Sequence, residues 1–298
     1  MKSPITGKEN CIILETFDSQ LVTELYKSKV GIEVARFFTN QKEFYIYCCN
    51  DSGFRFYAPT SLAGDGLFYE DLQNAFGDNY YRPWKWEHTK ALDTINKIDK
   101  VLEVGCGTGY FIEKLKNQGF STIGLELNEK AVGVGTEKGL TVYNELIENF
   151  AKNNANTFDV VCSFQVLEHI TDVKSYLESS ILCLKKGGKL IIGVPNNNPY
   201  LYRYDKYHAL NLPPHHAGLW DVATFEKLNQ FFDIEKISIN VEPLFDIRYQ
   251  LMLYFEYKNI NFASKIVKKL PNFIFTILKA LFSNLFAGRN IVAIYTKK

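Results

Sequence analysis

Between Lys100 and Val194, short apolar segments alternate with helical segments, and this alternation constrains the fold more than any other feature of the sequence. The segment at 158–164 is apolar almost throughout, as in a strand that is buried on both faces of a sheet. We expect strands at 100–104, 122–127, 140–143, 158–164 and 189–194. Strands that alternate with helices pair in parallel, because each helix returns the chain to the same edge of the sheet. The pattern predicts an α/β fold with helices on both faces of a mostly parallel sheet.

The sequence on either side of this segment differs in character. Residues 1–75 combine many aromatics with short apolar runs and turn signals, which predicts a small β-rich N-terminal region. Residues 76–298 are predicted to form one α/β domain, with a loop at 196–220 after the fifth strand. Two further strands are expected at 233–241 and 290–295. A basic helical stretch at about 249–288 is predicted as an insertion between these two strands.

The net charge of +1 conceals an uneven distribution. Residues 258–298 carry eight Lys or Arg and no Asp or Glu, whereas the rest of the chain carries 26 basic and 33 acidic residues. An acidic body argues against a general nucleic-acid-binding function. The six cysteines are irregularly spaced, the N-terminus shows no apolar signal segment, and no charge-free apolar run reaches about 18 residues. These features predict a protein of the reducing cytoplasm.

The sharpest motif is Val101-Leu-Glu-Val-Gly-Cys-Gly-Thr-Gly-Tyr-Phe111, in which an apolar strand leads into alternating glycines and then into a helix. Glycines at such a turn let a ligand approach the backbone, and the helix N-terminus offers free N–H groups. A dinucleotide-binding turn has the form G-x-G-x-x-G, but the third glycine here, Gly109, comes one residue early. An NAD-dependent oxidoreductase is therefore an alternative that the glycine spacing disfavours.

The same motif resembles motif I of the class I S-adenosylmethionine (SAM) methyltransferases, in the form E-x-G-x-G-x-G. Three further motifs of that family follow in order: Gly124-Leu-Glu-Leu127, Phe158 to Asp172 with Gln165-Val-Leu-Glu-His169, and Leu184-Lys-Lys-Gly-Gly to Asn196. The match is most similar to the branch that contains ubiquinone-type O-methyltransferases and the sugar methyltransferases of surface-polysaccharide clusters. The resemblance implies SAM as the cofactor. It also implies a Rossmann-like seven-stranded sheet, whose last strand is antiparallel and inserted near one edge.

The resemblance assigns cofactor contacts to the loops that follow successive strands. Glu126 is expected to accept both ribose hydroxyls, and the turn after the third strand is expected to contact adenine. The backbone near Phe164 and Gln165 is expected to meet the methionine end of the cofactor. The full cofactor set is Glu103, Gly105, Cys106, Gly107, Gly109, Glu126, Leu127, Glu145, Leu146, Phe164 and Gln165. An aromatic cluster of Tyr80, Tyr81, Trp84 and Trp86 lies where the family closes over its cofactor, with core packing as the alternative role.

Histidines supply the candidate catalytic groups. Methyl transfer requires alignment of the acceptor and, for many acceptors, removal of a proton by a base, which is often histidine. The candidates are His169, just past the fourth strand, and His215 and His216, in the loop after the fifth strand. Both places lie at the carboxyl ends of strands, where open α/β sheets bind ligands. Packing within a helix for His169, and packing against Trp220 for the other two, remain alternative roles.

The N-terminal region is similar to a zinc ribbon that precedes the methyltransferase domain in the polysaccharide branch. Such a ribbon holds one Zn²⁺ between two cysteine-bearing turns. The corresponding segments here are Ser3-Pro-Ile-Thr-Gly7 and Cys49-Asn-Asp-Ser-Gly53. Only Cys49 remains of the four ligands, and serine and threonine bind zinc poorly. The resemblance therefore implies a degenerate zinc-ribbon-like region at 1–75, and we expect no bound metal.

These observations predict a SAM-dependent methyltransferase that modifies a hydroxyl, or else a nitrogen or carbon, of a small metabolite, a sugar or a lipid-linked precursor. A non-catalytic SAM-binding or assembly protein is a second alternative, because the lost ribbon ligands show that part of the pattern has decayed. The basic stretch at about 249–288 either covers the core or lies on an anionic membrane. Nucleic acid is not expected as a partner, and the sequence does not indicate an oligomeric state.

Overall fold

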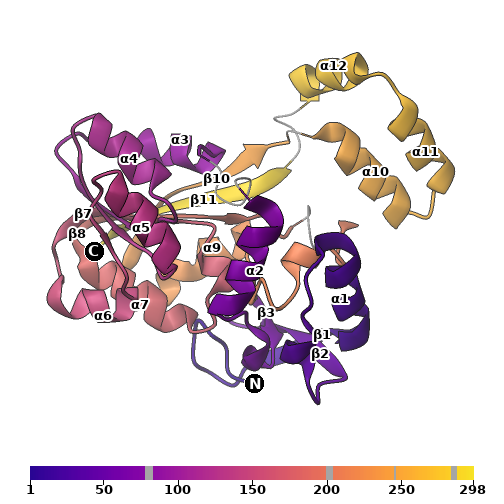
Figure 1. Ribbon diagram of the computed structural model, residues 1–298, viewed down its shortest axis with the longest axis horizontal. Helices are drawn as coiled ribbons and strands as arrows, with labels where there is room; N and C mark the ends of the chain where they lie inside the picture. Colours follow the sequence, from indigo (N-terminus) through magenta and orange to yellow (C-terminus); the bar gives the residue numbers. More distant parts are fainter. Residues whose placement is uncertain (78–82, 199–203, 245, 283–286) are drawn as a thin grey trace.

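The computed structural model describes residues 1–77, 83–198, 204–244, 246–282 and 287–298. Over these residues its centre is a seven-stranded sheet in the order β10-β11-β8-β7-β4-β5-β6 (Figure 1). The strands are β4 (Lys100–Val104), β5 (Ser121–Leu125), β6 (Val142–Tyr143), β7 (Phe158–Phe164), β8 (Leu184–Pro195), β10 (Ile234–Pro243) and β11 (Ala287–Lys297). Neighbours from β8 to β6 pair in parallel, whereas β11 is antiparallel to both β8 and β10. The predicted fold class is confirmed, including the antiparallel last strand near one edge.

Helices cover both faces because successive strand residues point to opposite sides of the sheet. Val101 belongs to a buried cluster with Phe111 and Leu115, whereas its neighbour Leu102 belongs to a cluster with Tyr176 and Leu177. The helices on the Val101 face are α3 (Trp86–Leu92) and α4 (Tyr110–Asn117), and those on the Leu102 face are α6 (Ile147–Phe150), α7 (Val173–Cys183) and α9 (Val222–Lys227). Between β5 and β6 the chain forms α5 (Glu129–Glu137).

Two elements, the third strand and the basic helical stretch, differ from their predictions. The third strand is reduced to the two residues of β6, since an edge strand has only one neighbour, β5, to pair with. The basic stretch forms three helices, α10 (Ile247–Tyr257), α11 (Asn261–Lys269) and α12 (Asn272–Phe282), which share a small apolar cluster and project from the body of the molecule (Figure 1). The break before α12 falls at Pro271, whose ring ends the preceding helix.

The N-terminal region contains two helices as well as the predicted strands. The strands are β1 (Cys11–Asp18), β2 (Glu43–Cys49) and β3 (Arg55–Ala58), and the helices are α1 (Ser19–Leu25) and α2 (Gly66–Phe76). Each helix follows an aspartate whose carboxylate caps the first turn: Asp18 accepts from the N–H of Leu21, and Asp65 from that of Phe68. These caps are a sequence signal for helix starts that the prediction of a β-rich region did not use.

The N-terminal sheet takes its fourth strand from a distant part of the chain. β9 (Gly218–Leu219), in the loop after β8, pairs antiparallel with β3 and gives the order β1-β2-β3-β9. Ile5 and Phe54 lie in the same buried cluster as Trp220, and the rings of Phe54 and Trp220 are 4.4 Å apart. The N-terminal region thus shares a sheet and a core with the rest of the chain. The boundary predicted at residue 75 stays a prediction.

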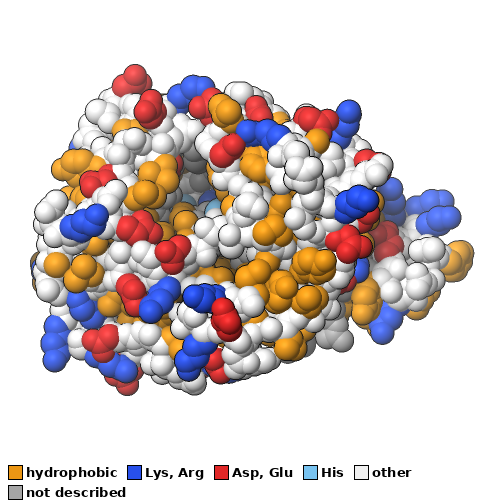
Figure 2. All heavy atoms as spheres, turned by 90° about the horizontal axis from the view of Figure 1, so that it is seen from below, with side chains coloured by type: hydrophobic (Ala, Val, Ile, Leu, Met, Phe, Trp, Pro, Cys, Tyr) orange, Lys and Arg blue, Asp and Glu red, His pale blue; other side chains and the backbone are white. Residues whose placement is uncertain are grey.

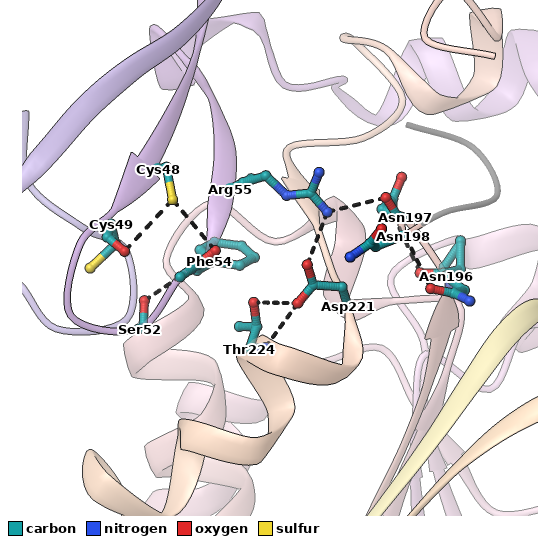
Figure 3. A network of polar contacts seen from close by, with 12 residues as sticks. Cys48, Cys49, Ser52, Phe54, Arg55, Asn196, Asn197, Asn198, Asp221 and Thr224 are labelled. Atoms are coloured by element: carbon teal, nitrogen blue, oxygen red, sulfur yellow. Dashed lines mark hydrogen bonds and ion pairs between the residues drawn. The ribbon is translucent and has the colours of Figure 1, made fainter. Parts of the chain in front are cut away.

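A buried ion pair joins the two parts (Figure 3). Arg55 Nη2 donates to Asp221 Oδ2 and to the carbonyl oxygen of Asn197, both at 3.1 Å. The two charged side chains are only 10% and 11% exposed. Asp221 Oδ1 also accepts hydrogen bonds from the N–H and the hydroxyl of Thr224. Through these bonds Asp221 caps the N-terminus of α9. Loss of either charged partner would leave the other charge buried and uncompensated.

The four positions of the predicted degenerate ribbon lie together. The hydroxyls of Ser3 and Ser52 hydrogen-bond with Cys49 Sγ, and Thr6 Oγ1 lies 4.0 Å from the same sulfur. Burial raises the pKa of Cys49, but the hydrogen bonds from Ser3 and Ser52 outweigh it, so that the pKa is lowered. Hydroxyls therefore surround the one cysteine at these positions. The relation to a zinc ribbon, and the expected lack of a metal there, stay predictions.

We expect Arg55→Leu to lower the free energy of unfolding by about 3–5 kcal/mol, because it leaves the Asp221 carboxylate buried without its cation. The matched control is Arg36→Leu, which removes an ion pair with Asp65 whose side chains are 42% and 51% exposed. An exposed pair contributes only about 0.2–1 kcal/mol. Urea denaturation followed by circular dichroism measures both variants. Equal losses would show that the buried pair does not hold the two parts together.

Candidate functional site

A glycine turn carries the chain from β4 to α4 at the carboxyl edge of the sheet. Gly105, Gly107 and Gly109 have φ values of +73°, +55° and +83°, in the left-handed region that glycine adopts without strain. A Cβ atom on Gly105 would lie 2.4 Å from Val166 Cγ2. The N–H of Gly105 donates to the carbonyl oxygen of Leu125 at 2.8 Å, which fixes the turn against β5. The predicted glycines therefore form a rigid backbone surface that leads into the N-terminus of α4.

Glu126 ties the end of β5 to this turn. Its carboxylate accepts hydrogen bonds from the N–H of Gly107 at 2.8 Å, of Leu127 at 2.8 Å and of Asn128 at 2.9 Å. The side chain of Asn144 donates to the carbonyl oxygens of Glu126 and Leu127, at 3.0 and 2.9 Å. The ends of β4, β5 and β6 are thus held together around one carboxylate.

Apolar side chains lie open to solvent beside Glu126. Leu127, Tyr143 and Leu146 are 58%, 46% and 48% exposed, and Glu145 is half-buried between the last two. Large apolar side chains at adjoining strand ends offer a flat surface to an aromatic ligand. Leu127, Glu145 and Leu146 were predicted at this place, whereas Tyr143 was not.

Two buried polar atoms near the turn have no hydrogen-bond partner within the described part of the chain. They are Oε2 of Glu103, which lies in β4, and Oγ1 of Thr108. Burial raises the pKa of Glu103 to about 8, opposed by Lys85 and supported by Glu126. A carboxyl group of this kind, buried beside the glycine turn, is suited to receive a cationic ligand group.

Two of the predicted cofactor residues turn their side chains into the core. Cys106 packs in a small apolar cluster with Ile112, and the Phe164 ring meets His88 edge-on at 4.9 Å between centroids. Only their backbone borders the site. Gln165, with φ of +59°, donates from Nε2 to Glu87 Oε1 of α3 at 2.8 Å, a contact that the sequence analysis missed.

The three predicted histidines come together from two loops. The ring centroids of His169, His215 and His216 are 4.6, 4.7 and 5.0 Å apart in pairs, and one ligand atom of each lies within 4.8 Å of the others. Nδ1 of each ring lies against an oxygen. Nδ1 of His169 is 2.6 Å from the carbonyl oxygen of His215, and Nδ1 of His215 is 2.8 Å from that of Leu210. Nδ1 of His216 is 2.9 Å from Asn211 Oδ1. An acceptor at Nδ1 keeps the proton there, so each Nε2 retains its lone pair.

Burial keeps this cluster electrically neutral near pH 7. It lowers the pKa of His169 to about 4 and that of His215 to about 3, and it holds the pKa of His216 well below its ordinary value. Glu168 Oε1 lies 3.8 Å from His169 Nε2, whereas Oε2 is buried without a partner in the ranges given above. Burial also raises the pKa of Glu168 to about 8. Glu168 was not among the predicted site residues, although it directly precedes His169.

The molecular surface is hollowed on the face shown in Figure 2, and histidine side chains (pale blue) are visible inside the hollow. Tyr69 of α2 lines the histidine cluster, with its ring 5.7 Å from that of His169. Of the predicted aromatic cluster, Tyr80 and Tyr81 lie outside the described residues. Trp84 lies against α4, where Lys114 Nζ is 3.8 Å from its ring centroid. Both Trp84 and Trp86 pack against the buried cluster that contains Phe111, as in the alternative role of core packing.

With this geometry established, comparison with known proteins identifies the family. A model of a methyltransferase domain family matches residues 76–239, which is more than half of the chain. The chain belongs to this methyltransferase family. The predicted class I SAM methyltransferase family, and SAM as its cofactor, are thereby confirmed. The oxidoreductase alternative is set aside.

Curated relatives support the same assignment. The ubiquinone biosynthesis O-methyltransferase of Vibrio parahaemolyticus is 33% identical over 111 residues, which cover 35% of this chain and 47% of that protein. The enzyme of the same name from Dechloromonas aromatica is 30% identical over 153 residues, which cover 48% of this chain and 65% of that protein. The chain thus spans about half to two thirds of the length of the relatives it matches.

Solved structures share the fold. A SAM-dependent methyltransferase from Archaeoglobus fulgidus has a TM-score of 0.54 and 16% identity, covering 78% of this chain and 100% of that one. A SAM-dependent methyltransferase from Thermotoga maritima has a TM-score of 0.52 and 19% identity, covering 78% and 97%. None of the helices in the described part of this chain has the length and apolar character needed to span a bilayer.

The buried carboxyl of Glu103 predicts a pH dependence of stability. Its pKa rises from 4.5 to about 8 on folding, so the folded state holds an extra proton between these values. The stability from this group is complete below about pH 4 and is lost as the pH rises to about 8. Because Glu168 and the buried histidines also titrate differently on folding, the prediction concerns a difference between two proteins. The free energy of unfolding of the wild type minus that of Glu103→Gln should decline by up to about 1.4 kcal/mol per pH unit in this window. Glu129→Gln, at an exposed position, is the control in urea denaturation at several pH values. Parallel curves for all three proteins would contradict the prediction.

Proposed function

We propose that the protein transfers the methyl group of SAM to a hydroxyl oxygen of a small acceptor. The observation that carries this proposal is the cluster of three neutral imidazoles, each with Nδ1 against an oxygen, at the edge of the sheet where the glycine turn lies. Oxygen as the accepting atom is supported by the relatives, which are named O-methyltransferases. The acceptor classes that fit are a small metabolite, a sugar or a lipid-linked precursor.

The residues around the glycine turn fit SAM group by group. The turn itself offers backbone N–H groups and room for close approach. Glu126 would accept from the ribose hydroxyls, and the exposed side chains of Leu127 and Leu146 would contact the adenine. The carboxyl of Glu103, buried and without a partner among the described residues, would pair with the ammonium group of the methionine part.

SAM supplies an activated methyl group on a sulfonium, so the chain mainly has to align and deprotonate the acceptor. The hydroxyl of the acceptor would donate to an Nε2 of the histidine cluster. Its proton passes to that nitrogen as the carbon–oxygen bond forms and the carbon–sulfur bond breaks. The products are the methylated acceptor and S-adenosylhomocysteine, and the imidazolium then releases its proton to water.

Calorimetric titration tests the cofactor part of this proposal. We expect binding of SAM and S-adenosylhomocysteine and no binding of NAD. Glu126→Ala should weaken the binding of both sulfur nucleotides by roughly ten- to a hundredfold, because charged hydrogen bonds contribute about 1.5–3 kcal/mol. Glu129→Ala, with an exposed carboxylate three residues away, should leave the affinity unchanged. Unchanged affinity in Glu126→Ala would refute the ribose contact.

The catalytic part is measured as release of S-adenosylhomocysteine, with a panel of phenols and sugars as acceptors. His215→Ala should lower the rate at least a hundredfold at unchanged SAM affinity, since a positioned base contributes about 10²–10⁴-fold. SAM binding without release on any acceptor, including cell extract, would favour the alternative of a non-catalytic SAM-binding protein. A full rate in His215→Ala, His169→Ala and His216→Ala would exclude the cluster from catalysis.

A further inference from the structure

We propose that His169, His215, His216 and Glu168 bind a divalent transition-metal ion such as Zn²⁺. Binding of the ion does not depend on the proposed function, but its role in activating the acceptor does. The expectation of no bound metal rested on the missing cysteines of the N-terminal region. The histidine cluster lies elsewhere and has a complete donor set of its own.

The imidazoles are arranged as metal ligands are. One ring nitrogen of each lies within 4.8 Å of the others, which is close enough for three nitrogens to share one ion after small side-chain rotations. Metal-bound histidines typically donate their other ring N–H to a carbonyl or carboxylate oxygen, which fixes the tautomer and orientation. All three Nδ1 atoms here make that contact, at 2.6–2.9 Å.

Glu168 provides the independent observation that points to a cation. Its side chain is only 1% exposed, and Oε2 has no hydrogen-bond partner in the described part of the chain. Its Oε1 lies 3.8 Å from Nε2 of His169, so the carboxyl group borders the same space. A cation bound by the histidines would compensate this carboxylate. Imidazole ligands with one carboxylate favour Zn²⁺, Fe²⁺ or Co²⁺ over Mg²⁺.

A chain of hydrogen bonds also links one of the ligands, His216, to the end of β8. Asn211 accepts from His216 and donates from Nδ2 to Asn197 Oδ1 at 2.8 Å, and Asn197 donates in turn to the Pro195 carbonyl at the end of β8. Three imidazoles and one carboxylate leave room for a further ligand on a five- or six-coordinate ion. With the ion bound, the ring nitrogens that coordinate it cannot act as the base, and the ion would take over the activation of the acceptor. An acceptor hydroxyl bound to the ion would lose its proton to water, and its oxygen would then form the bond to the methyl carbon as the carbon–sulfur bond breaks.

Cobalt binding tests the site without SAM or acceptor. The full chain is freed of metal with a chelator and titrated with Co²⁺, and visible d–d absorption is followed; competition by Zn²⁺ gives its affinity. We expect one equivalent to bind. His215→Ala and Glu168→Ala should weaken binding at least tenfold, as should Asn211→Leu, which removes the hydrogen bond that orients His216. Asn211→Asp keeps an acceptor oxygen and should retain binding.

The control variant is His208→Ala, which removes one imidazole outside the cluster. SAM titration of every variant shows whether the fold is intact, and it separates failure of the metal site from failure of the proposed function. Binding that survives in His215→Ala and Glu168→Ala would overturn the proposal. A near-ultraviolet thiolate band would overturn it too, by placing the ion on Cys48 and Cys49 instead.

A different observation carries a second inference: we propose that α11 and α12 dock on an anionic phospholipid surface. Phe262 and Ile266 of α11 are 76% and 45% exposed, and Phe273, Ile277 and Leu281 of α12 are 62%, 54% and 65% exposed. Within each helix these residues are four apart, so they form one stripe along one side. The opposite side packs on α10 through Val267 and Phe275. The stripes are therefore apolar surface that the described chain leaves in solvent.

The positive charge around these stripes indicates which kind of partner they bind. Lys265, Lys268 and Lys269 are exposed on α11, and residues 258–298 include no Asp or Glu. Exposed apolar side chains flanked by lysines on helices that project from the body (Figure 1) match the interface of an anionic bilayer. A second copy of the chain would bring a like-charged surface against the first.

Vesicle co-sedimentation tests this docking with phosphatidylcholine vesicles that contain or lack phosphatidylglycerol. We expect binding only to the anionic vesicles. The triple variant Phe273→Ser/Ile277→Ser/Leu281→Ser should lose it, and Lys265→Gln/Lys268→Gln/Lys269→Gln should weaken it at least tenfold. Ile98→Ser, which changes an apolar residue that is 93% exposed on the body, should bind fully. Unchanged binding of the triple serine variant, or dimerisation through these residues without vesicle binding, would overturn the proposal.

Discussion

The position of the histidine cluster depends on the hydrogen bonds with which the N-terminal region holds the loop after β8. That loop has little regular structure, yet much of it is buried, so its polar backbone groups need partners from elsewhere. The Tyr26 hydroxyl donates to the Leu212 carbonyl at 2.8 Å, and the N–H of Tyr57 donates to the Ala217 carbonyl at 2.9 Å. The two-residue strand β9 and the ion pair of Arg55 with Asp221 fix the end of the loop. The N-terminal region is thus a support for the candidate site, not only an appendage of the α/β domain.

Neutrality is the second constraint on the site. Burial raises the pKa of Glu103 and of Glu168 to about 8 and lowers that of His169 to about 4, so each group favours its uncharged form near pH 7. Burying a lone charge in such a site is costly, but a cation can bind there if a carboxylate of the protein beside it compensates its charge. The proposed methionine ammonium beside Glu103 and the proposed metal ion beside Glu168 would be two cases of the same principle, the first at the glycine turn and the second at the histidine cluster.

The parts of the site that follow from local chemistry could be predicted from the sequence. The left-handed turn at Gly105 is encoded by residue type, and Glu126 follows from its place at a strand end. The direction of the Phe164 side chain could not be predicted in the same way, because residues 158–164 are apolar on both faces of the strand and do not show which face meets the site. The pairing of β9 with β3 could not be predicted at all, since two residues in a long loop carry no periodicity. The carboxyl group of Glu168 became a candidate only when the fold showed it buried beside His169.

The same long-range contacts bear on the stability of the N-terminal region, whose turns at 3–7 and 49–53 contain one cysteine. A small ribbon has too little core to fold alone and normally depends on its metal. Here Phe54 packs against Trp220, β9 extends the sheet, and Arg55 is paired in the interior with Asp221. These contacts tie the stability of the region to the rest of the chain. Because this packing supplies stability, the hydroxyls of Ser3 and Ser52 can surround Cys49 without loss of the fold, and the region in turn supports the histidine loop.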